Sequence, residues 1–367
     1  MQVNRPLIRT IQDDPSDRSA GILAADPRLV PTGTRESIVP VDWQSAMKRA
    51  IRSTTELRQR LGLPTETACH AAAEADFPTF VPLEFLSRIE PGNPDDPLLR
   101  QVLATESEQS DAADFVSDPV GDLAAMAAPS LIQKYRGRAL VISTGACGVH
   151  CRYCFRRSFP YSEVGTPARS TQSAIDYLRK SPEVDEVILS GGDPLTLVDV
   201  KLFELIEQIE SIPRVKRLRI HTRMPVVIPQ RVTPDLVQRL RHSRLATWFV
   251  IHANHAQELD AHVLDHIGLL VDVGIPVLNQ AVLLRGVNDD AEALIRLSRT
   301  LVDHRVQPYY LHQLDRVRGA AHFEVSVDRG VQLVAEMRKQ LPGYAVPTYV
   351  REEPGEPSKT AIVDDSL

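Results

Sequence analysis

The segment ALVISTGACGVHCRYC, residues 139–154, joins a short apolar run to three closely spaced cysteines. ALVIST is rich in β-branched and aliphatic residues, which is typical of a buried strand. The cysteines follow it directly with the spacing Cys-x3-Cys-x2-Cys. Thiols this close together cannot form a sensible disulfide framework, so the pattern indicates a metal site at the end of a strand.

Further strand-like runs continue the pattern downstream. EVILS, RLRIHT, TWFVIHA, IPVLNQAVLL and YYLHQ begin near residues 186, 217, 246, 275 and 308. A repeat of about 30 residues matches one strand plus one returning helix. Such βα units predict a parallel sheet, which is either curled into a barrel or opened as a doubly wound sheet.

Polar groups follow every one of these runs, and they favour the curled sheet. After the cysteines come SGGDP (190–194), HTR (221–223), HANH (252–255), RGVNDD (285–290) and HQLD (312–315). A curled sheet lets all six loops face one cavity, whereas a flat sheet spreads them along an edge. We therefore predict an α/β fold in which residues 126–343 form a partial (β/α)6 TIM-like barrel.

The flanking regions differ in composition from this central part. Residues 1–125 are predicted to be a polar N-terminal arm, up to about residue 35, followed by a mainly helical accessory region. Helical spacing covers about 41–63 and LAAMAAP (123–129), and the Pro-punctuated stretch 81–103 predicts short helices and turns. In the C-terminal segment, 344–367, the β-rich VPTYV is expected to help the tail fold over the barrel mouth.

The bulk composition is that of an ordinary globular protein. A net charge of −6 argues against a nucleic-acid partner, and no apolar stretch predicts a signal peptide or a membrane partner. We therefore expect a cytoplasmic protein. The isolated Cys69 is expected to be a free thiol.

Three thiolates on a short loop can bind three irons of a cubane cluster. The fourth iron would then keep an open position where a cofactor can bind, and the small residues Gly145, Ala146 and Gly148 would let the backbone wrap closely. Two alternatives remain at this point. One is a structural zinc site completed by His150, and the other is three unconnected thiols.

The cysteine spacing resembles that of the radical S-adenosylmethionine (SAM) superfamily. In that superfamily SAM chelates the open iron of a [4Fe–4S] cluster, and its cleavage gives a 5′-deoxyadenosyl radical. The resemblance implies that Cys147, Cys151 and Cys154 hold the cluster. SGGDP looks like the glycine-rich SAM-contacting loop, which implies cofactor contacts by Ser190, Gly191, Gly192 and Asp193.

Longer stretches resemble the lysine 2,3-aminomutase family, most of all its short branch that supplies β-lysine for modifying elongation factor P. They include KYRGR (134–138), CRYCFRRSFPY, ILSGGDPL, MPVVIPQRVT, LNQAVLLRGVNDD, PYYLHQLDRVRGAAHF and GYAVPTYVREEPGEPSK. The resemblance covers about residues 80–360. It implies an isomerase that converts L-lysine to β-lysine with the cluster, SAM and pyridoxal 5′-phosphate (PLP).

The same resemblance implies partners for the reaction. They are the substrate L-lysine, an electron donor such as flavodoxin or ferredoxin, and a functional link to elongation factor P and its β-lysine ligase. We also expect that the chain can form a homo-oligomer. The larger relatives carry additional cysteines for a structural zinc, which this chain lacks, so we predict no zinc.

Site roles carry over from the family residue by residue. Lys359 matches the Schiff-base lysine, and Arg156 matches the guanidinium that holds the substrate carboxylate. The PLP phosphate would be bound by Lys134, Tyr135 and Arg138, where the larger relatives commonly have Arg at the first position. The distant ammonium of lysine would meet Asp289 and Glu352, although the catabolic enzymes have aspartate at the second position.

Two alternatives to a lysine enzyme remain. An aminomutase for another amino acid, such as glutamate, would place a side-chain carboxylate against Asp289 and Glu352, where like charges repel. A degenerate scaffold that binds a cluster or zinc and docks a partner would not need the cysteines, Arg156 and Lys359 together.

Overall fold

The strand-like runs of the sequence form neighbouring parallel strands in a computed structural model, which describes residues 41–65, 68–110, 112–162 and 167–363. The strands are β3 (Arg138–Thr144), β4 (Glu186–Gly191), β5 (Arg217–Thr222), β6 (Ala246–His252), β7 (Val277–Val282) and β8 (Gln307–His312). Their positions confirm the prediction from the β-branched runs.

A helix returns the chain after each of these strands. The helices are α6 (Pro167–Lys180), α7 (Asp199–Glu210), α9 (Pro234–Arg241), α10 (Ala261–Asp272), α11 (Ala291–Asp303) and α12 (Val327–Gln340). Side-chain oxygens of Thr233, Asp260, Asp290 and Ser326 accept hydrogen bonds from the first turns of α9 to α12, which explains where these helices begin. The repeating βα order is therefore encoded by the β-branched runs, which form the strands, and by the N-cap residues, which start the helices.

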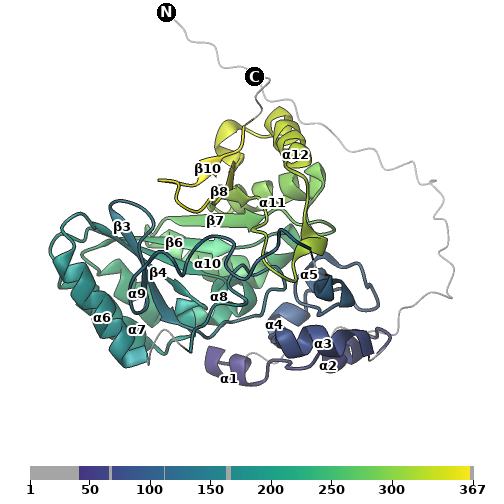
Figure 1. Cartoon of the computed structure of the whole chain (residues 1–367), viewed down its shortest axis with the longest axis horizontal. Coiled ribbons are helices and arrows are strands. Elements are labelled where there is room, and N and C mark those ends of the chain that lie inside the picture. The colour runs from purple at the N-terminus through teal and green to yellow at the C-terminus, as the bar shows by residue number, and fades with distance from the viewer. Residues whose placement is uncertain (1–40, 66–67, 111, 163–166, 364–367) are drawn as a thin grey trace, which may run out of the picture. The chain divides into compact units, whose positions relative to one another are not determined.

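Additional strands extend the sheet at both ends. β1 (Met126–Ala128) and β2 (Leu131–Ile132) precede β3 and are antiparallel. β9 (Thr348–Arg351) is parallel to β8, and β10 (Thr360–Ala361) is antiparallel to β9. The described strands are ordered β1 to β10 in sequence, and the two end strands do not pair with each other, so the curved sheet stays open (Figure 1). The partial barrel is thus an open α/β sheet.

The region before the sheet consists of short helices and turns. They are α1 (Trp43–Lys48), α2 (Thr54–Arg60), α3 (Ala68–Asp76), α4 (Leu83–Leu86), α5 (Pro97–Arg100) and the 3-10 helix η1 (Glu106–Gln109). Later short helices are α8 (Met224–Val227), η2 (Pro194–Thr196), η3 (Pro229–Arg231), η4 (Ala256–Glu258), η5 (Ala321–Phe323) and η6 (Gly343–Ala345). The expected helical stretch 41–63 is therefore two helices with a break between them.

One local expectation is wrong. LAAMAAP (123–129) is a turn followed by strand β1 rather than a helix. Pro129 disfavours helical backbone at Ala128, and pairing of Met126 with Ile132 supplies the ladder that an isolated short helix would lack. Tertiary pairing has overridden the helix propensity of the alanines.

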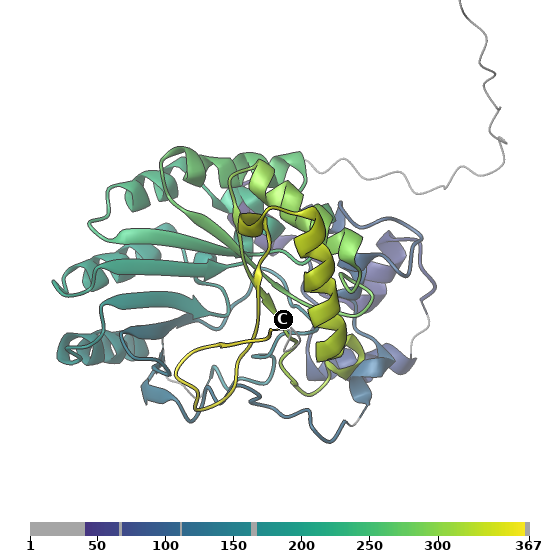
Figure 2. The ribbon, with the colours of Figure 1, turned by 90° about the horizontal axis from the view of Figure 1, so that it is seen from above.

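The core lies between the sheet and its helices. Val141, Leu189, Ile220 and Phe249 of successive strands are fully buried, and Ile206 of α7 packs in the same cluster. Burial of each such side chain stabilises the fold by roughly 1.5–3 kcal/mol. The C-terminal segment lies beside α12 (Figure 2).

Some expectations are not decided by the fold. No helix among the described residues is long and apolar enough to cross a bilayer. The N-terminal arm lies outside the described residues, as does the side chain of Cys69. The division at residues 125 and 343 stays a prediction.

Candidate active site

A cavity of about 330 Å³ lies at the carboxyl ends of the parallel strands. Its lining includes every residue predicted from the sequence except one: Cys147, Cys151, Cys154, Lys134, Tyr135, Arg138, Ser190, Gly191, Gly192, Asp193, Arg156, Glu352 and Lys359. Asp289 does not line it. The predicted residues that line the cavity extend from Lys134, before β3, to Lys359, before β10. The curved sheet therefore brings together groups that are distant in the chain.

The three cysteines share one part of this cavity, in the loop after β3. Burial, and then the neighbouring thiols, raise the pKa of Cys147, and the same two causes raise the pKa of Cys154 to about 11. Arg223 donates a hydrogen bond to Cys151 Sγ at 2.7 Å. A partly buried set of soft thiols beside a cation fits a metal centre that demands thiolates.

A cluster and a single ion make different demands on the placement of these thiols. Among the described residues, no group of three His, Cys, Asp or Glu side chains is placed to hold one metal ion. Three thiolates that each bind a different iron of a cubane need not converge on one point. His150, the suggested zinc ligand, instead hydrogen-bonds the carbonyl of Pro78 at 2.7 Å and stacks on Phe77.

Glycines let the SGGDP loop pack against the cysteine loop. A Cβ on Gly192 would lie 2.2 Å from the carbonyl oxygen of Ala146, and one on Gly148 would lie 2.4 Å from Met224 Sδ. Part of the space that these glycines leave open is therefore filled by other residues of the chain and not by a cofactor. Gly192 is needed first for the contact between the two loops, and Gly148 for the contact of the cysteine loop with Met224 of α8.

Asp193 ties this loop to the end of β5. Its buried carboxylate accepts hydrogen bonds from Thr222 Oγ1, and from the backbone amides of Leu195, Arg223 and Met224, at 2.7–3.1 Å. Burial raises its pKa in spite of these donors. A carboxylate has about four acceptor positions, so the chain's own donors already use those of Asp193.

Arg223, in the HTR run (221–223), is a residue of the site whose role the sequence did not indicate. Its buried guanidinium contacts Gln101, Glu258 and Tyr153 as well as Cys151. Glu258 is fully buried, and its ion pair with Arg223 is 2.8 Å long. The accessory region therefore supports the cysteine loop through Gln101, which sequence spacing does not indicate.

Charged side chains form an alternating row across the cavity. Asp122 receives Arg156 Nε and Lys134 Nζ, each at 2.6 Å, and Lys134 also contacts Glu352 at 2.7 Å. Glu352 in turn pairs with Lys359. The row runs Arg156, Asp122, Lys134, Glu352, Lys359, so each acid is shared by two cations.

These pairs control the ionisation of the two acids. Burial by itself would raise the pKa of Glu352, but Lys359 and Lys134 outweigh it and lower that pKa to about 2. Arg156 and Lys134 likewise outweigh burial and lower the pKa of Asp122. Asp122 was missed in the sequence, because it precedes the strands in a segment whose composition suggested a helix.

The neighbouring groups suit a phosphate and an aldehyde cofactor. The guanidinium of Arg138 stacks on the ring of Tyr135, 4.4 Å from its centroid, and both line the cavity. Lys359 presents the required amine. Lys134 fits less directly, because Val120 O, Asp122 and Glu352 already surround its ammonium.

Histidines complete the wall. His221, His252 and His312 line the cavity, and burial is the first cause that lowers the pKa of each, that of His252 to about 3. The buried Nε2 atoms of His221 and His312 have no hydrogen-bond partner in the described part of the chain. Such atoms fit a site that is completed by a ligand. His255 instead caps η4 and, like His322, is not part of this lining.

Comparison with known proteins supports one part of this picture, a radical SAM enzyme with a [4Fe–4S] cluster and SAM. A family model described as the Radical SAM superfamily matches residues 141–298. An L-lysine 2,3-aminomutase of Escherichia coli (strain K12) is 46% identical over 323 residues, covering 88% of this chain and 94% of that protein. The L-lysine 2,3-aminomutase of Clostridium subterminale is 36% identical over 324 residues, covering 88% of this chain and 78% of that protein.

Other matches agree with these. An L-lysine 2,3-aminomutase of Haemophilus influenzae is 44% identical, with 88% of this chain and 96% of that protein covered. A crystal structure of a radical SAM methyltransferase from Sphaerobacter thermophilus matches with a TM-score of 0.43 and 17% identity, covering 60% of this chain and 68% of that one. No argument rests on this last likeness.

Proposed function

Because the chain belongs to the L-lysine 2,3-aminomutase family of radical SAM enzymes, we propose that it uses PLP together with the cluster and SAM to convert L-α-lysine to β-lysine. The chain is an isomerase, and its family implies a [4Fe–4S] cluster and SAM. The observation that carries the proposal is the placement of Lys359 in the same cavity as Cys147, Cys151 and Cys154. That placement unites the two cofactor sites that a lysine aminomutase requires.

When bound, the cluster and SAM supply a radical that removes a hydrogen from the substrate, and PLP supplies the carbon that carries the migrating amino group. The chain supplies position. Arg156 offers a guanidinium for the substrate carboxylate, and its Nε is held by Asp122. The reaction requires that the substrate is held in a reactive orientation while water is excluded. A guanidinium that is already fixed by Asp122 can hold the substrate carboxylate in that orientation better than a mobile one.

Substrate binding by Glu352 stays a prediction, and the contacts of this residue support a further role beside it. Both of its oxygens are used, one by Lys134 and one by Lys359. We propose that it orients the amine of Lys359 toward the cofactor aldehyde, and that Arg138 and Tyr135 bind the cofactor phosphate. Lys134 would then bind the phosphate only if its ammonium left one of its present partners, Asp122 or Glu352.

The deciding experiment is product analysis. Anaerobic, reduced enzyme with SAM and PLP is incubated with L-lysine, and the amino acids are separated on a chiral column. We expect β-lysine, and the column also gives its enantiomer. Conversion of another amino acid such as glutamate, with none of lysine, would favour the alternative aminomutase. No conversion of either would favour the scaffold.

Two variants test the proposed cluster site and the proposed PLP site independently of each other. Cys151→Ala should lose bound iron and turnover together, because one of three cluster ligands is gone. Lys359→Ala should keep its iron and lose the visible absorbance band of protein-bound PLP, together with turnover. Cys69→Ala is the matched control and should retain both. Full activity with full iron content in Cys151→Ala would remove the basis of the cluster assignment.

We further propose that the β-lysine is used to modify elongation factor P. The support is the resemblance of the long stretches around the motifs to the branch with that role. Adding elongation factor P and its β-lysine ligase to the completed reaction should increase the mass of the factor by one lysyl residue. An unchanged mass, while synthetic β-lysine is attached under the same conditions, would contradict this link. An external electron donor and a cytoplasmic location remain part of the proposal.

A further inference from the structure

Arg223 is a buried cation in the wall of the cysteine cavity. It follows β5 directly and is 6% exposed. Its Nη1 donates hydrogen bonds to Cys151 Sγ at 2.7 Å and to Tyr153 Oη at 2.8 Å. Within the described part of the chain, no side chain donates a hydrogen bond to the sulfur of Cys147 or Cys154. The guanidinium therefore distinguishes one of the three thiols from the other two.

The other side of this guanidinium is held by an acid. Its Nη2 donates to Glu258 at 2.8 Å and to Gln101 at 2.6 Å. Glu258 is fully buried, does not line the cavity, and uses its second oxygen to accept the backbone amides of Asn254 and His255 at 2.8 and 3.1 Å. The acid therefore anchors the cation, while the cation is the group that contacts the thiol.

The backbone of Arg223 is fixed as well. Its amide donates to Asp193 at 2.7 Å, and its carbonyl oxygen accepts the amides of Val226 and Val227 at the start of α8. Moving the guanidinium away from Cys151 would break contacts of a largely buried ion pair, which is costly. The position of this charge is thus set by the fold before any cofactor binds.

A fixed cation at this sulfur has a consequence for a cluster held by the three cysteines. As a ligand, Cys151 is a thiolate, and reduction adds one more negative charge to the cluster. A hydrogen-bonded cation stabilises the reduced form more than the oxidised form, which raises the reduction potential. The effect is stronger in a buried site, because water screens the charges less there.

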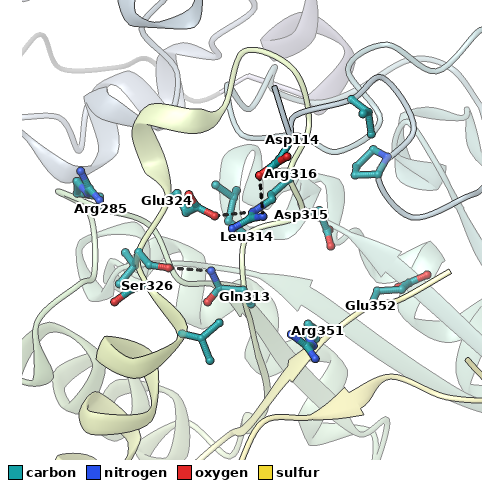
Figure 3. A pocket seen from close by; sticks show the side chains of 14 residues that line it. Asp114, Arg285, Gln313, Leu314, Asp315, Arg316, Glu324, Ser326, Arg351 and Glu352 are labelled. Atoms are coloured by element: carbon teal, nitrogen blue, oxygen red, sulfur yellow. Dashed lines mark hydrogen bonds and ion pairs between the residues drawn. The ribbon is translucent and has the colours of Figure 1, made fainter. Parts of the chain in front are cut away.

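A second arginine shows what an exposed cation looks like in the same molecule. Arg316 lines an outer cavity of about 570 Å³, and Figure 3 shows it joined to Asp114 and Glu324. Its side chain is 53% exposed, and it does not line the cysteine cavity. Exposed ion pairs of this kind contribute little, so Arg316 offers a matched control for Arg223.

We propose that Arg223, anchored by Glu258, is a positioning residue that acts through Cys151 and raises the reduction potential of the [4Fe–4S] cluster. The inference rests on the cluster of the proposed function. It extends that function by naming the side chain that makes the cluster easier to reduce. One electron passes from an external low-potential reductant to the oxidised cluster, and no bond of the chain forms or breaks in this step.

The test is a redox titration that is followed by electron paramagnetic resonance. The full chain is reconstituted anaerobically with iron, sulfide and PLP, without SAM, and is poised with dithionite and redox mediators while the signal of the reduced cluster is recorded. The proteins are the wild type, Arg223→Gln, Arg223→Lys, Glu258→Gln and the control Arg316→Gln. Iron and sulfide analysis shows which of them hold the cluster.

We expect the ratio of reduced to oxidised cluster at a fixed potential to fall about tenfold in Arg223→Gln, which is a shift of about 59 mV for a one-electron couple. Arg223→Lys keeps the charge and should restore most of this ratio. Glu258→Gln removes the opposing charge and should shift the ratio in the other direction. Arg316→Gln should leave it unchanged.

Equal potentials in the wild type and in Arg223→Gln, with equal iron content, would overturn the proposal. A shift of the same sign in Arg223→Gln and Glu258→Gln would also overturn it, since that result indicates a general disturbance of the cysteine loop. If Arg223→Gln does not retain iron, Glu258→Gln decides, and an unchanged or lower ratio there contradicts the inference.

The wild type separates this inference from the proposed function. If it carries the cluster and forms β-lysine while the potentials contradict the expectation, only the role of Arg223 fails. If it shows no cluster signal and forms no product, the proposed function fails as well.

Discussion

At the scale of single residues, the candidate site is governed by how its charges are paired. Asp122 and Glu352 each pair with two members of a row of three cations, Arg156, Lys134 and Lys359. Breaking a largely buried pair leaves an uncompensated charge, which costs far more than an exposed pair is worth. The row therefore keeps Arg156 and Lys359 in place before any ligand arrives.

At the scale of elements, the two loops after β3 and β4 behave as one unit. Gly192 lies so close to Ala146 that any side chain would force the backbones apart. Asp193 then ties the unit to the end of β5. The cysteine loop is thus held by the SGGDP loop, for which the sequence predicts contacts with SAM.

Gly192→Ala tests this contact. The added methyl group would meet backbone atoms, which cannot swing away as a side chain can, so we expect a loss of stability of roughly 1–3 kcal/mol and a lower iron content. Denaturant unfolding and iron analysis measure the two effects.

Gly268→Ala is the matched control. It lies in α10, and a Cβ there meets nothing within 4 Å. Alanine should raise stability by about 0.5–1 kcal/mol and leave iron unchanged. Wild-type iron and stability in Gly192→Ala would show that the loops do not depend on each other.

At the scale of the whole molecule, the open edge of the sheet lets the tail reach the cavity. β9 adds to β8, and β10 turns back on β9, which brings Lys359 beside Glu352. Most residues from Pro354 to Val363 are exposed or only partly buried. This tail therefore adds little to the hydrophobic core, and its main contribution is the side chain of Lys359 in the cavity.

Ending the chain at Gly355 should therefore remove function without unfolding the protein. We expect a melting temperature within about 3 °C of the wild type, because little apolar surface is lost, and a normal iron content. The absorbance band of bound PLP should disappear with Lys359. Calorimetry and absorbance test this, and loss of iron in the truncated protein would show that the tail also stabilises the cysteine loop.

Local sequence patterns determined most of the fold. Runs of β-branched residues located β3 to β8, and the cysteine spacing located the metal loop, because strand formation and ligand spacing depend on residues that are neighbours in the chain. The same local reasoning failed at 123–129, where a long-range ladder with β2 decides the structure.

The partners of each charge were decided only by the tertiary structure. The sequence alone determined that Arg156, Glu352 and Lys359 are present in motifs that resemble a family. That Asp122 joins Arg156 to Lys134 and that Asp289 lies outside the cavity depends on contacts between segments far apart in the chain. Electrostatic energy falls with distance and rises with burial, and both quantities exist only once the chain has folded.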